Sequence, residues 1–289
     1  MIKLLLPVDF SDYSLNAMNY AIKLGEKIPS EIILAHCFPE VVEDTDLGLP
    51  PGTVVENPQK LIREKRAEEK MILEKLKEET ERRLTEEQRK NITITTRFEI
   101  GYAEDVLLAL SEEISPDVIV MGTKSKDETI KELLGSVTSD VVRMARVPVL
   151  TIPADMDIDL EKISNVLFVT DFSEVDYESL HKLIKLISPF KTVIYAIQFN
   201  TSHPDKWDRE KKNEFQRYCM ETYRNHTIEA EILYSEDFLK EIDKFIKEKS
   251  IDIIAMTRKK RNIIMSLFHP SITRKILFHT NIPLLVFHT

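Results

Sequence analysis

Cysteine is scarce in this chain of 289 residues, and its two cysteines, Cys37 and Cys219, stand far apart without a CxxC spacing. A disulfide framework needs pairs of cysteines, and a thiolate metal site needs them at short spacing, so the sequence argues against both. No metal ligand is predicted. Such cysteine usage is typical of the reducing cytoplasm, which is the location that we expect.

Long apolar runs are missing as well. No run reaches the ~18–20 residues that a membrane-spanning helix needs. The N-terminus enters a strand-like run, Ile2–Val8, without the charged, apolar and cleavage regions of a signal peptide in their usual order. We therefore expect no membrane partner and no signal peptide.

Basic residues are outnumbered by acidic residues in the first half of the chain. The formal net charge is −9; residues 1–160 carry 20 Lys and Arg against 31 Asp and Glu, whereas residues 161–289 carry 20 against 18. A nucleic-acid backbone is bound by a basic face, so nucleic acid is not expected as a partner. The composition is otherwise that of an ordinary globular protein, 43% hydrophobic and 31% charged, and the length suits two domains of ~145 residues.

An internal repeat accounts for that length. Leu4–Ser11 recurs as Val166–Ser173 at a shift of 162 residues, with Asp-Phe-Ser common to both copies. Towards the C-terminus the shift is 135 residues, as between Met121 and Met256. One domain has therefore been duplicated. The difference between the two shifts, 27 residues, indicates an insertion in the first copy, between Pro39 and Lys90.

The two copies define the predicted domains. The first spans residues 1–155, with a helical insertion at about 39–90 that holds one long helix from Gln59 to about Lys90; the second spans 160–289. Strands and helices alternate in both, which predicts α/β domains with a doubly wound parallel sheet. The expected strands are Lys3–Val8, Glu31–Phe38, Ile92–Phe98, Val118–Met121, Val147–Ile152, Val166–Val169, Thr192–Gln198, Thr227–Tyr234, Ile251–Met256 and Ile282–Phe287.

The stretch from Asp117 to Pro153 carries the plainest functional signal. An apolar strand ends at Gly122, a charged loop follows, and Gly135 with Ser136 opens a helical pattern. The first turn of a helix has N–H groups without intrahelical partners and the positive end of the helix dipole, so it accepts phosphate oxygens. Both glycines permit a positive φ and close approach of a ligand, and Ser136 is a suitable N-cap. By itself the pattern leaves open phosphate binding and glycines that serve packing alone.

Further short motifs frame this stretch. They are Pro7-Val8-Asp9-x-Ser11, Leu34-Ala35-His36, Asp117–Thr123, Leu133–Val137 and Val147–Leu150. Together they resemble the universal stress protein family, and the duplication is similar to that of its tandem two-domain members. The resemblance covers nearly the whole chain apart from the insertion. It implies two Rossmann-like five-stranded sheets in strand order 3-2-1-4-5, whose fifth strands pair in an intramolecular pseudo-dimer. It is also compatible with a homodimer of the whole chain.

The resemblance also implies an ATP site in the first domain, at the carboxyl ends of its first, second and fourth strands. The family's phosphate motif is a glycine, two residues, a second glycine, nine residues, then Gly-Ser or Gly-Thr. Gly122 and Gly135-Ser136 fill this motif, but Ser125 stands at the second glycine. ATP is the implied cofactor, with Mg²⁺ as a companion. The residues expected to contact the nucleotide are Pro7, Val8, Asp9, Ser11, Cys37, Met121, Gly122, Lys124, Ser125, Lys126, Gly135, Ser136 and Val137.

By the same resemblance, Asp9 contacts the adenosine end, the backbone at Cys37 flanks the adenine, and Lys124 and Lys126 add charge near the phosphates. A plainer interpretation stands beside each role. Asp9 is also suited to cap a helix or to form a turn. Lys124 and Lys126 are also suited to a solvated loop. Cys37 and the adjacent His36 are expected to pack at a strand end rather than to bind a metal.

The second copy has lost the motif. Thr257, Lys260 and Pro270 stand where the first copy has Gly122, Ser125 and Gly135. Proline has no N–H to offer a phosphate, and threonine adds a branched side chain where close approach was needed. The neighbouring basic run Arg258–Arg261 and His269 are expected to be solvated. One nucleotide site per chain is therefore predicted.

Three classes of function remain. The leading hypothesis is a nucleotide-binding protein of stress response or signalling, whose second half is structural. The alternative is an adaptor or scaffold that binds no nucleotide and works through the insertion and the dimer faces. A nucleotidyl-transferring enzyme is disfavoured, because the chain has neither a HIGH-type sequence nor a Ser-Gly-Gly pyrophosphate loop near the first strand. No catalytic residue is predicted, and slow ATP hydrolysis is the most activity expected.

Overall fold

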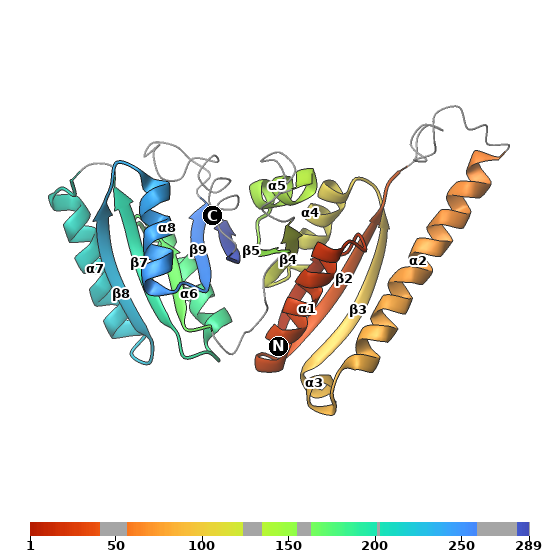
Figure 1. Cartoon of the computed structure of the whole chain (residues 1–289), viewed down its shortest axis with the longest axis horizontal. Coiled ribbons are helices and arrows are strands. Elements are labelled where there is room, and N and C mark those ends of the chain that lie inside the picture. Colours follow the sequence, from red (N-terminus) through yellow and green to blue (C-terminus); the bar gives the residue numbers. More distant parts are fainter. Residues whose placement is uncertain (41–56, 124–134, 155–162, 201–202, 259–281, 289) are drawn as a thin grey trace.

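The ten strands of the chain form one continuous sheet (Figure 1). The structure is a computed structural model that describes residues 1–40, 57–123, 135–154, 163–200, 203–258 and 282–288. The strand order is β3-β2-β1-β4-β5-β10-β9-β6-β7-β8, so each half contributes five parallel strands in the order 3-2-1-4-5. This confirms the predicted fold.

The strands lie close to their predicted ranges, within two residues at each end. They are β1 (Ile2–Pro7), β2 (Ser30–Phe38), β3 (Ile92–Ile100), β4 (Val118–Thr123), β5 (Val149–Pro153), β6 (Asn165–Val169), β7 (Val193–Asn200), β8 (Thr227–Tyr234), β9 (Ile253–Arg258) and β10 (Leu284–His288). The residues between the two predicted domains, 156–159, lie outside the described residues.

Helices cover both faces of the sheet, because successive residues of a buried strand point to opposite sides. Leu4 and Leu6 of β1 face one apolar layer, and Leu5 faces the other. The first layer includes α1 (Asp12–Lys27), α2 (Pro58–Arg83), α6 (Glu174–Ile187) and α7 (Lys206–Thr222), and the second includes α4 (Ala103–Ile114), α5 (Gly135–Met144) and α8 (Phe238–Lys249). None of the described helices is both long and apolar enough to cross a membrane.

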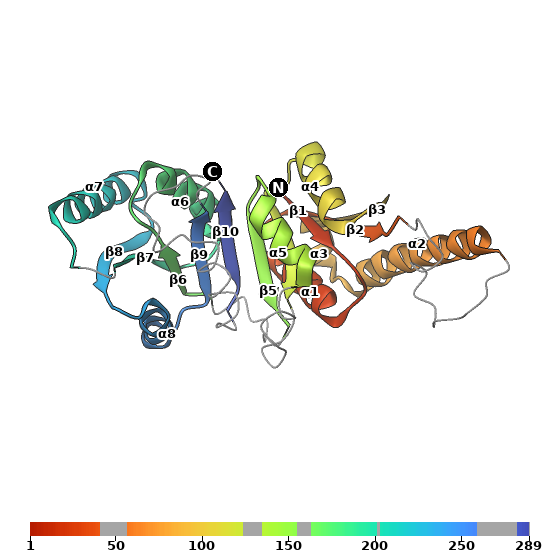
Figure 2. The same ribbon diagram turned by 90° about the horizontal axis from the view of Figure 1, so that it is seen from above.

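The two halves meet at the centre of the sheet. Figure 2 shows β5 and β10 side by side, and they pair antiparallel with Leu150 opposite Leu285. The halves therefore form the predicted pseudo-dimer within one chain. An ion pair also joins the two halves. Nζ of Lys185 on α6 lies 3.0 Å from Oδ1 of Asp117, which directly precedes β4.

The insertion departs from its prediction as a single helix. Instead, α2 ends at Arg83, and a short helix, α3 (Glu86–Asn91), follows beside α1. A capping box causes the break: the Thr85 hydroxyl accepts the N–H of Gln88 at 3.2 Å, and the Gln88 side chain accepts the N–H of Thr85 at 2.7 Å. Figure 1 shows α2 along the outer side of β3, extending past the sheet.

Candidate functional site

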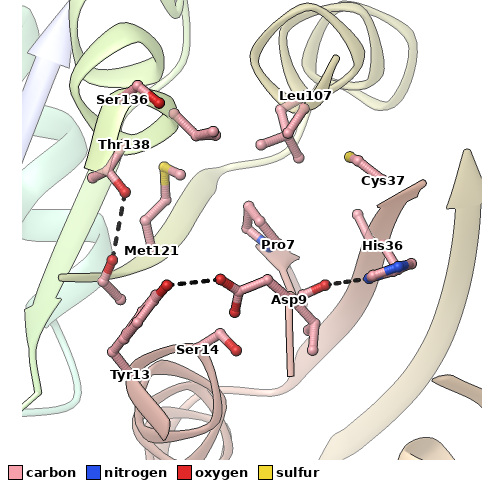
Figure 3. A pocket seen from close by; sticks show the side chains of 15 residues that line it. Pro7, Asp9, Tyr13, Ser14, His36, Cys37, Leu107, Met121, Ser136 and Thr138 are labelled. Carbon is pink, nitrogen blue, oxygen red and sulfur yellow. Dashed lines mark hydrogen bonds between the residues drawn. The ribbon is translucent and has the colours of Figure 1, made fainter. Parts of the chain in front are cut away.

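A cavity of about 300 Å³ opens in the first half where β1, β2 and β4 end (Figure 3). In an open parallel sheet this is the point where the strand order reverses, and ligands bind there in this kind of fold. The lining residues are Pro7, Val8, Asp9, Tyr13, Ser14, Ala35, His36, Cys37, Ala103, Leu107, Met121, Gly122, Ser136, Val137 and Thr138.

Asp9 lies in a tight turn between β1 and α1. Phe10 takes a positive φ of 65°, uncommon for a residue with a side chain, and Ser11 caps α1 by accepting the N–H of Ser14. Oδ1 of Asp9 accepts the N–H and hydroxyl of Ser11, and Oδ2 accepts the Tyr13 hydroxyl at 2.9 Å. Burial alone raises its pKa, but hydrogen bonds, those of Ser11 and Ser14 foremost, hold the pKa below the usual 3.8. Asp9 is therefore an oriented negative charge.

The first turn of α5 forms one end of the cavity. Ser136, Val137 and Thr138 line it, and the Thr138 hydroxyl donates to the carbonyl of Gly122 at 3.5 Å. The helix begins at Gly135, so Ser136 lies inside the first turn and the predicted N-cap role is wrong. The N–H groups of Ser136 and Val137 are among those that a helix leaves without an intrahelical partner. This end of the cavity is therefore suited to an anion.

Gly122 is required for packing rather than for an unusual turn. Its φ is not positive, so the structure does not use the conformational freedom that glycine permits there. A Cβ at this position would collide with the backbone carbonyl of Tyr13, because the first turn of α1 lies directly against β4. The missing side chain therefore brings α1, and the Asp9 turn with it, up to the fourth strand.

The other end of the cavity is apolar. Leu107 and Cys37 line it. Burial, together with the carboxylates of Glu99 and Glu104, raises the pKa of Cys37 to about 12. The sulfur is therefore a neutral thiol at physiological pH and behaves as a small apolar group.

His36 joins the cavity wall to the insertion. Its ring stacks on Phe10 with centroids 4.6 Å apart, and Nδ1 donates to the carbonyl of Val8 at 2.7 Å. Nε2 lies 2.9 Å from Oε2 of Glu69 on α2. These contacts hold the imidazole at the strand end, which is the packing role that was expected of it.

The polar and apolar ends face each other across the cavity. Figure 3 shows Ser136 and Thr138 on one side, Leu107 and Cys37 on the other, and Asp9 below and between them. A ligand that fits must therefore be amphipathic, with an anionic part and a flat or apolar part.

Most of the residues expected to contact a nucleotide line this cavity. They are Pro7, Val8, Asp9, Cys37, Met121, Gly122, Ser136 and Val137. Ser11 lies beside the cavity and bonds to Asp9, and Gly135 begins α5. Lys124, Ser125 and Lys126 lie outside the described residues.

Sequence reasoning missed several lining residues. The structure adds Tyr13, Ser14, Ala35, Ala103, Leu107 and Thr138. Some of them could have been predicted from the positions where helices begin, because the first turns of the helices lie at the carboxyl edge of a doubly wound sheet. Tyr13 lies in the first turn of α1, and Ala103 is the first residue of α4.

Larger side chains occupy the equivalent space in the second half. β7 pairs with β6 as β2 pairs with β1, so Phe199 takes the position of Cys37. It is only 2% exposed and packs edge-on against Phe245, with ring centroids 6.4 Å apart. Thr257, wholly buried, takes the position of Gly122. The rest of the degenerate motif lies outside the described residues: Lys259–Arg261, His269 and Pro270.

The fold and the cavity together define a tandem pair of doubly wound α/β domains with a ligand cavity at the switch point of the first. The sequence model of the universal stress protein family matches residues 1–153, more than half of the chain, and the chain belongs to this family. Universal stress protein MJ0531 of Methanocaldococcus jannaschii is 29% identical over 151 residues, which are 52% of this chain and 81% of that protein.

Solved structures show the same fold across both halves. A universal stress protein from Archaeoglobus fulgidus superposes with a TM-score of 0.74 at 18% identity, covering 99% of this chain and 98% of its own. A putative universal stress protein from Pseudomonas aeruginosa gives a TM-score of 0.56 at 13% identity, covering 100% and 93%. The tandem arrangement is therefore found elsewhere in the family.

Proposed function

We propose that the first half of this chain binds one adenine nucleotide, ATP foremost, in a role in stress response or signalling. The observation that carries this proposal is the polarity of the cavity. The first turn of α5 lines one end, and Cys37 and Leu107 line the other. A nucleotide has the same two ends, since its phosphates suit a helix N-terminus and its base suits an apolar slot.

Asp9 orients the ligand in this proposal. Its carboxylate, ionised at neutral pH, repels phosphates but accepts hydrogen bonds from hydroxyl groups. The ribose would therefore lie over β1, with the phosphates directed to α5. Lys124, Ser125 and Lys126 are proposed to add phosphate contacts, Ser125 through its N–H and hydroxyl where the family has glycine.

A single site per chain follows from the second half. Phe199 fills the space that Cys37 leaves open, and the buried Thr257 replaces Gly122. Both changes remove room for a base and a phosphate. We therefore assign the nucleotide to the first half alone.

Magnesium is proposed only as a companion of the phosphates. Within the described ranges, no group of three or more His, Cys, Asp or Glu side chains could hold a metal ion. The phosphate oxygens would supply the principal ligands, as is usual for this ion. Slow hydrolysis is the most activity proposed, and no side chain is assigned to it. A cytoplasmic location is proposed from the two free thiols, Cys37 and Cys219.

An adaptor function is the second candidate, and α2 favours it. Met71 and Ile72 on this insertion helix are 65% and 38% exposed. The helix also extends past the sheet (Figure 1). An adaptor would use this helix, together with the faces available for self-association into a homodimer, and would need no nucleotide.

Release of nucleotide on denaturation tests the proposal. Freshly purified protein is denatured and its supernatant is chromatographed; close to one adenine nucleotide per chain is expected. ATP with MgCl₂ should raise the melting temperature of the emptied protein. If neither nucleotide nor a thermal shift is found, the nucleotide proposal is rejected and the adaptor function gains support.

A matched pair of variants tests the single site. Gly135→Val places a branched side chain in the first turn of α5 and should abolish ATP binding. Pro270→Val changes the equivalent position of the second half and should leave the affinity unchanged. Equal losses from the two variants would contradict a single site.

A further inference from the structure

The C-terminal end of α5 is held by the second half of the chain. His288, at the end of β10, has Nε2 at 2.8 Å from the carbonyl oxygen of Val142 and Nδ1 at 3.0 Å from that of Val147. Arg258, at the end of β9, donates from Nη1 to the carbonyl of Arg143. Val142 and Arg143 belong to the last turn of α5, whose carbonyls have no intrahelical partner.

Two hydrogen-bond donors meet this helix end. The carbonyl oxygens only accept hydrogen bonds, so His288 contributes a ring N–H to them. The His288 side chain is buried in that position. Burial and the neighbouring Arg143 lower the pKa of Arg258, but a guanidinium still carries its charge at neutral pH. Cations at a helix C-terminus stabilise the helix through its dipole.

The opposite end of the same helix faces the cavity. Ser136 and Thr138 line it, and α5 has only ten residues from Gly135 to Met144. A helix of that length moves as a rigid rod of ~15 Å, so the position of its C-terminal end sets the position of its first turn. A hydrogen bond of 3.5 Å from the Thr138 hydroxyl to the carbonyl of Gly122 joins that first turn to β4.

We infer that Arg258 and His288 are positioning residues for the phosphate end of the nucleotide site, an inference that rests on the proposed function. The second half, whose own motif is degenerate, thereby serves the first half's site by fixing α5. The apolar end of the cavity is built from β2 and α4, through Cys37 and Leu107, and neither element contains a partner of this cap. The two residues act on the phosphates through α5 and do not touch the ligand.

Comparison of ATP with adenosine separates this role from general stability. Arg258→Met and His288→Ala are each expected to weaken ATP about three- to tenfold, while adenosine affinity, measured by titration at high ligand concentration, stays unchanged. Arg258→Lys keeps the cation and should restore most of the ATP affinity. Lys185→Ala is the matched control, because it removes a contact between the halves, the ion pair with Asp117, that does not involve α5.

Hydrogen exchange of the nucleotide-free protein supplies a second readout. The amides of α5 should exchange faster in Arg258→Met and in His288→Gln than in wild type, while those of β1 keep their protection, which shows that the variants are folded. Wild-type protein that binds no ATP rejects the proposed function. If wild-type protein binds ATP, three results would overturn the positioning role alone. The variants would bind ATP normally, or they would lose ATP and adenosine alike, or the exchange of α5 would be unchanged in them.

Discussion

Phe199 takes, in the second half of the chain, the strand position that Cys37 holds in the first. Cys37 lines a cavity of about 300 Å³, whereas Phe199 is 2% exposed and packs against Phe245. One position in the second strand therefore separates a half with room for a ligand from a half with a filled core.

Cys37→Phe should convert the first half to the state of the second. The ring is expected to enter the cavity and to weaken ATP at least about tenfold, with a small change in melting temperature because it fills empty space. Cys37→Ala keeps the cavity open and should bind ATP nearly as wild type does. Calorimetric titration of both variants makes the comparison, and unchanged ATP affinity in Cys37→Phe would place the ligand elsewhere.

Asp9→Asn should weaken ATP about tenfold, because a neutral amide is a poorer acceptor than a carboxylate for a hydroxyl donor. The pKa of Asp9 lies below 3.8, so the carboxylate stays ionised above that pH. ATP affinity should therefore be insensitive to this group between pH 5 and 8 and should fall only in stronger acid. Tyr13→Phe removes one hydroxyl donor to Asp9 and is expected to have a smaller effect. An affinity in Asp9→Asn equal to wild type would remove Asp9 from the site.

Gly122→Ala should destabilise the protein by about 1–3 kcal/mol, because the added Cβ meets the rigid backbone carbonyl of Tyr13. Gly25→Ala is the control. There the added Cβ meets side-chain atoms, Cγ1 and Cδ1 of Ile92, which can rotate away as a backbone carbonyl cannot, and alanine favours the helix by about 1 kcal/mol over glycine. Urea unfolding should show a large loss for the first variant and a small one for the second. Similar losses would mean that α1 can move away from β4.

Asp117→Asn should weaken the contact between the halves by about 0.5 kcal/mol, since exposed ion pairs are screened by solvent. Burial raises the pKa of the Asp117 carboxyl. The N–H of Lys3 and the ammonium of Lys185 lower this pKa by more than burial raises it, so it lies below 3.8. A lowered pKa means that the stabilisation is complete above 3.8 and is lost as pH falls through the folded-state value. The difference in unfolding free energy between wild type and Asp117→Asn should accordingly be constant from pH 5 to 8 and narrow towards pH 3. A difference that grows in acid would contradict this assignment.

The alternation of strands and helices in two copies was sufficient to predict two doubly wound α/β domains, whereas the strand order and the central pairing of β5 with β10 were implied by the resemblance to the family. The break in the insertion was missed although Thr85 and Gln88 have the spacing of a capping box. A long charged stretch favours one helix by composition, and the local hydrogen bonds that end it act over only three residues.

The site was harder to predict than the fold. The sequence showed that Gly122 permits a positive φ and close approach of a ligand, but the structure uses its missing side chain to admit the backbone of Tyr13. That approach is a tertiary distance, which no local motif reports. The role of Phe199 depends likewise on the register of β7 against β6. Residues such as Leu107 come from a helix far along the chain and carry no motif. Position in the sheet, rather than residue type, brings them to the cavity.

The antiparallel pairing of β5 with β10 has a consequence for assembly. Each of these strands has a neighbour on both sides, β4 and β10 for one and β5 and β9 for the other. Their backbone groups are therefore already committed within the chain, and a second molecule cannot pair with them without opening the sheet. Among the strands that the structure describes, β3 and β8 border the sheet, so a homodimer that extends this sheet would form through one of those borders.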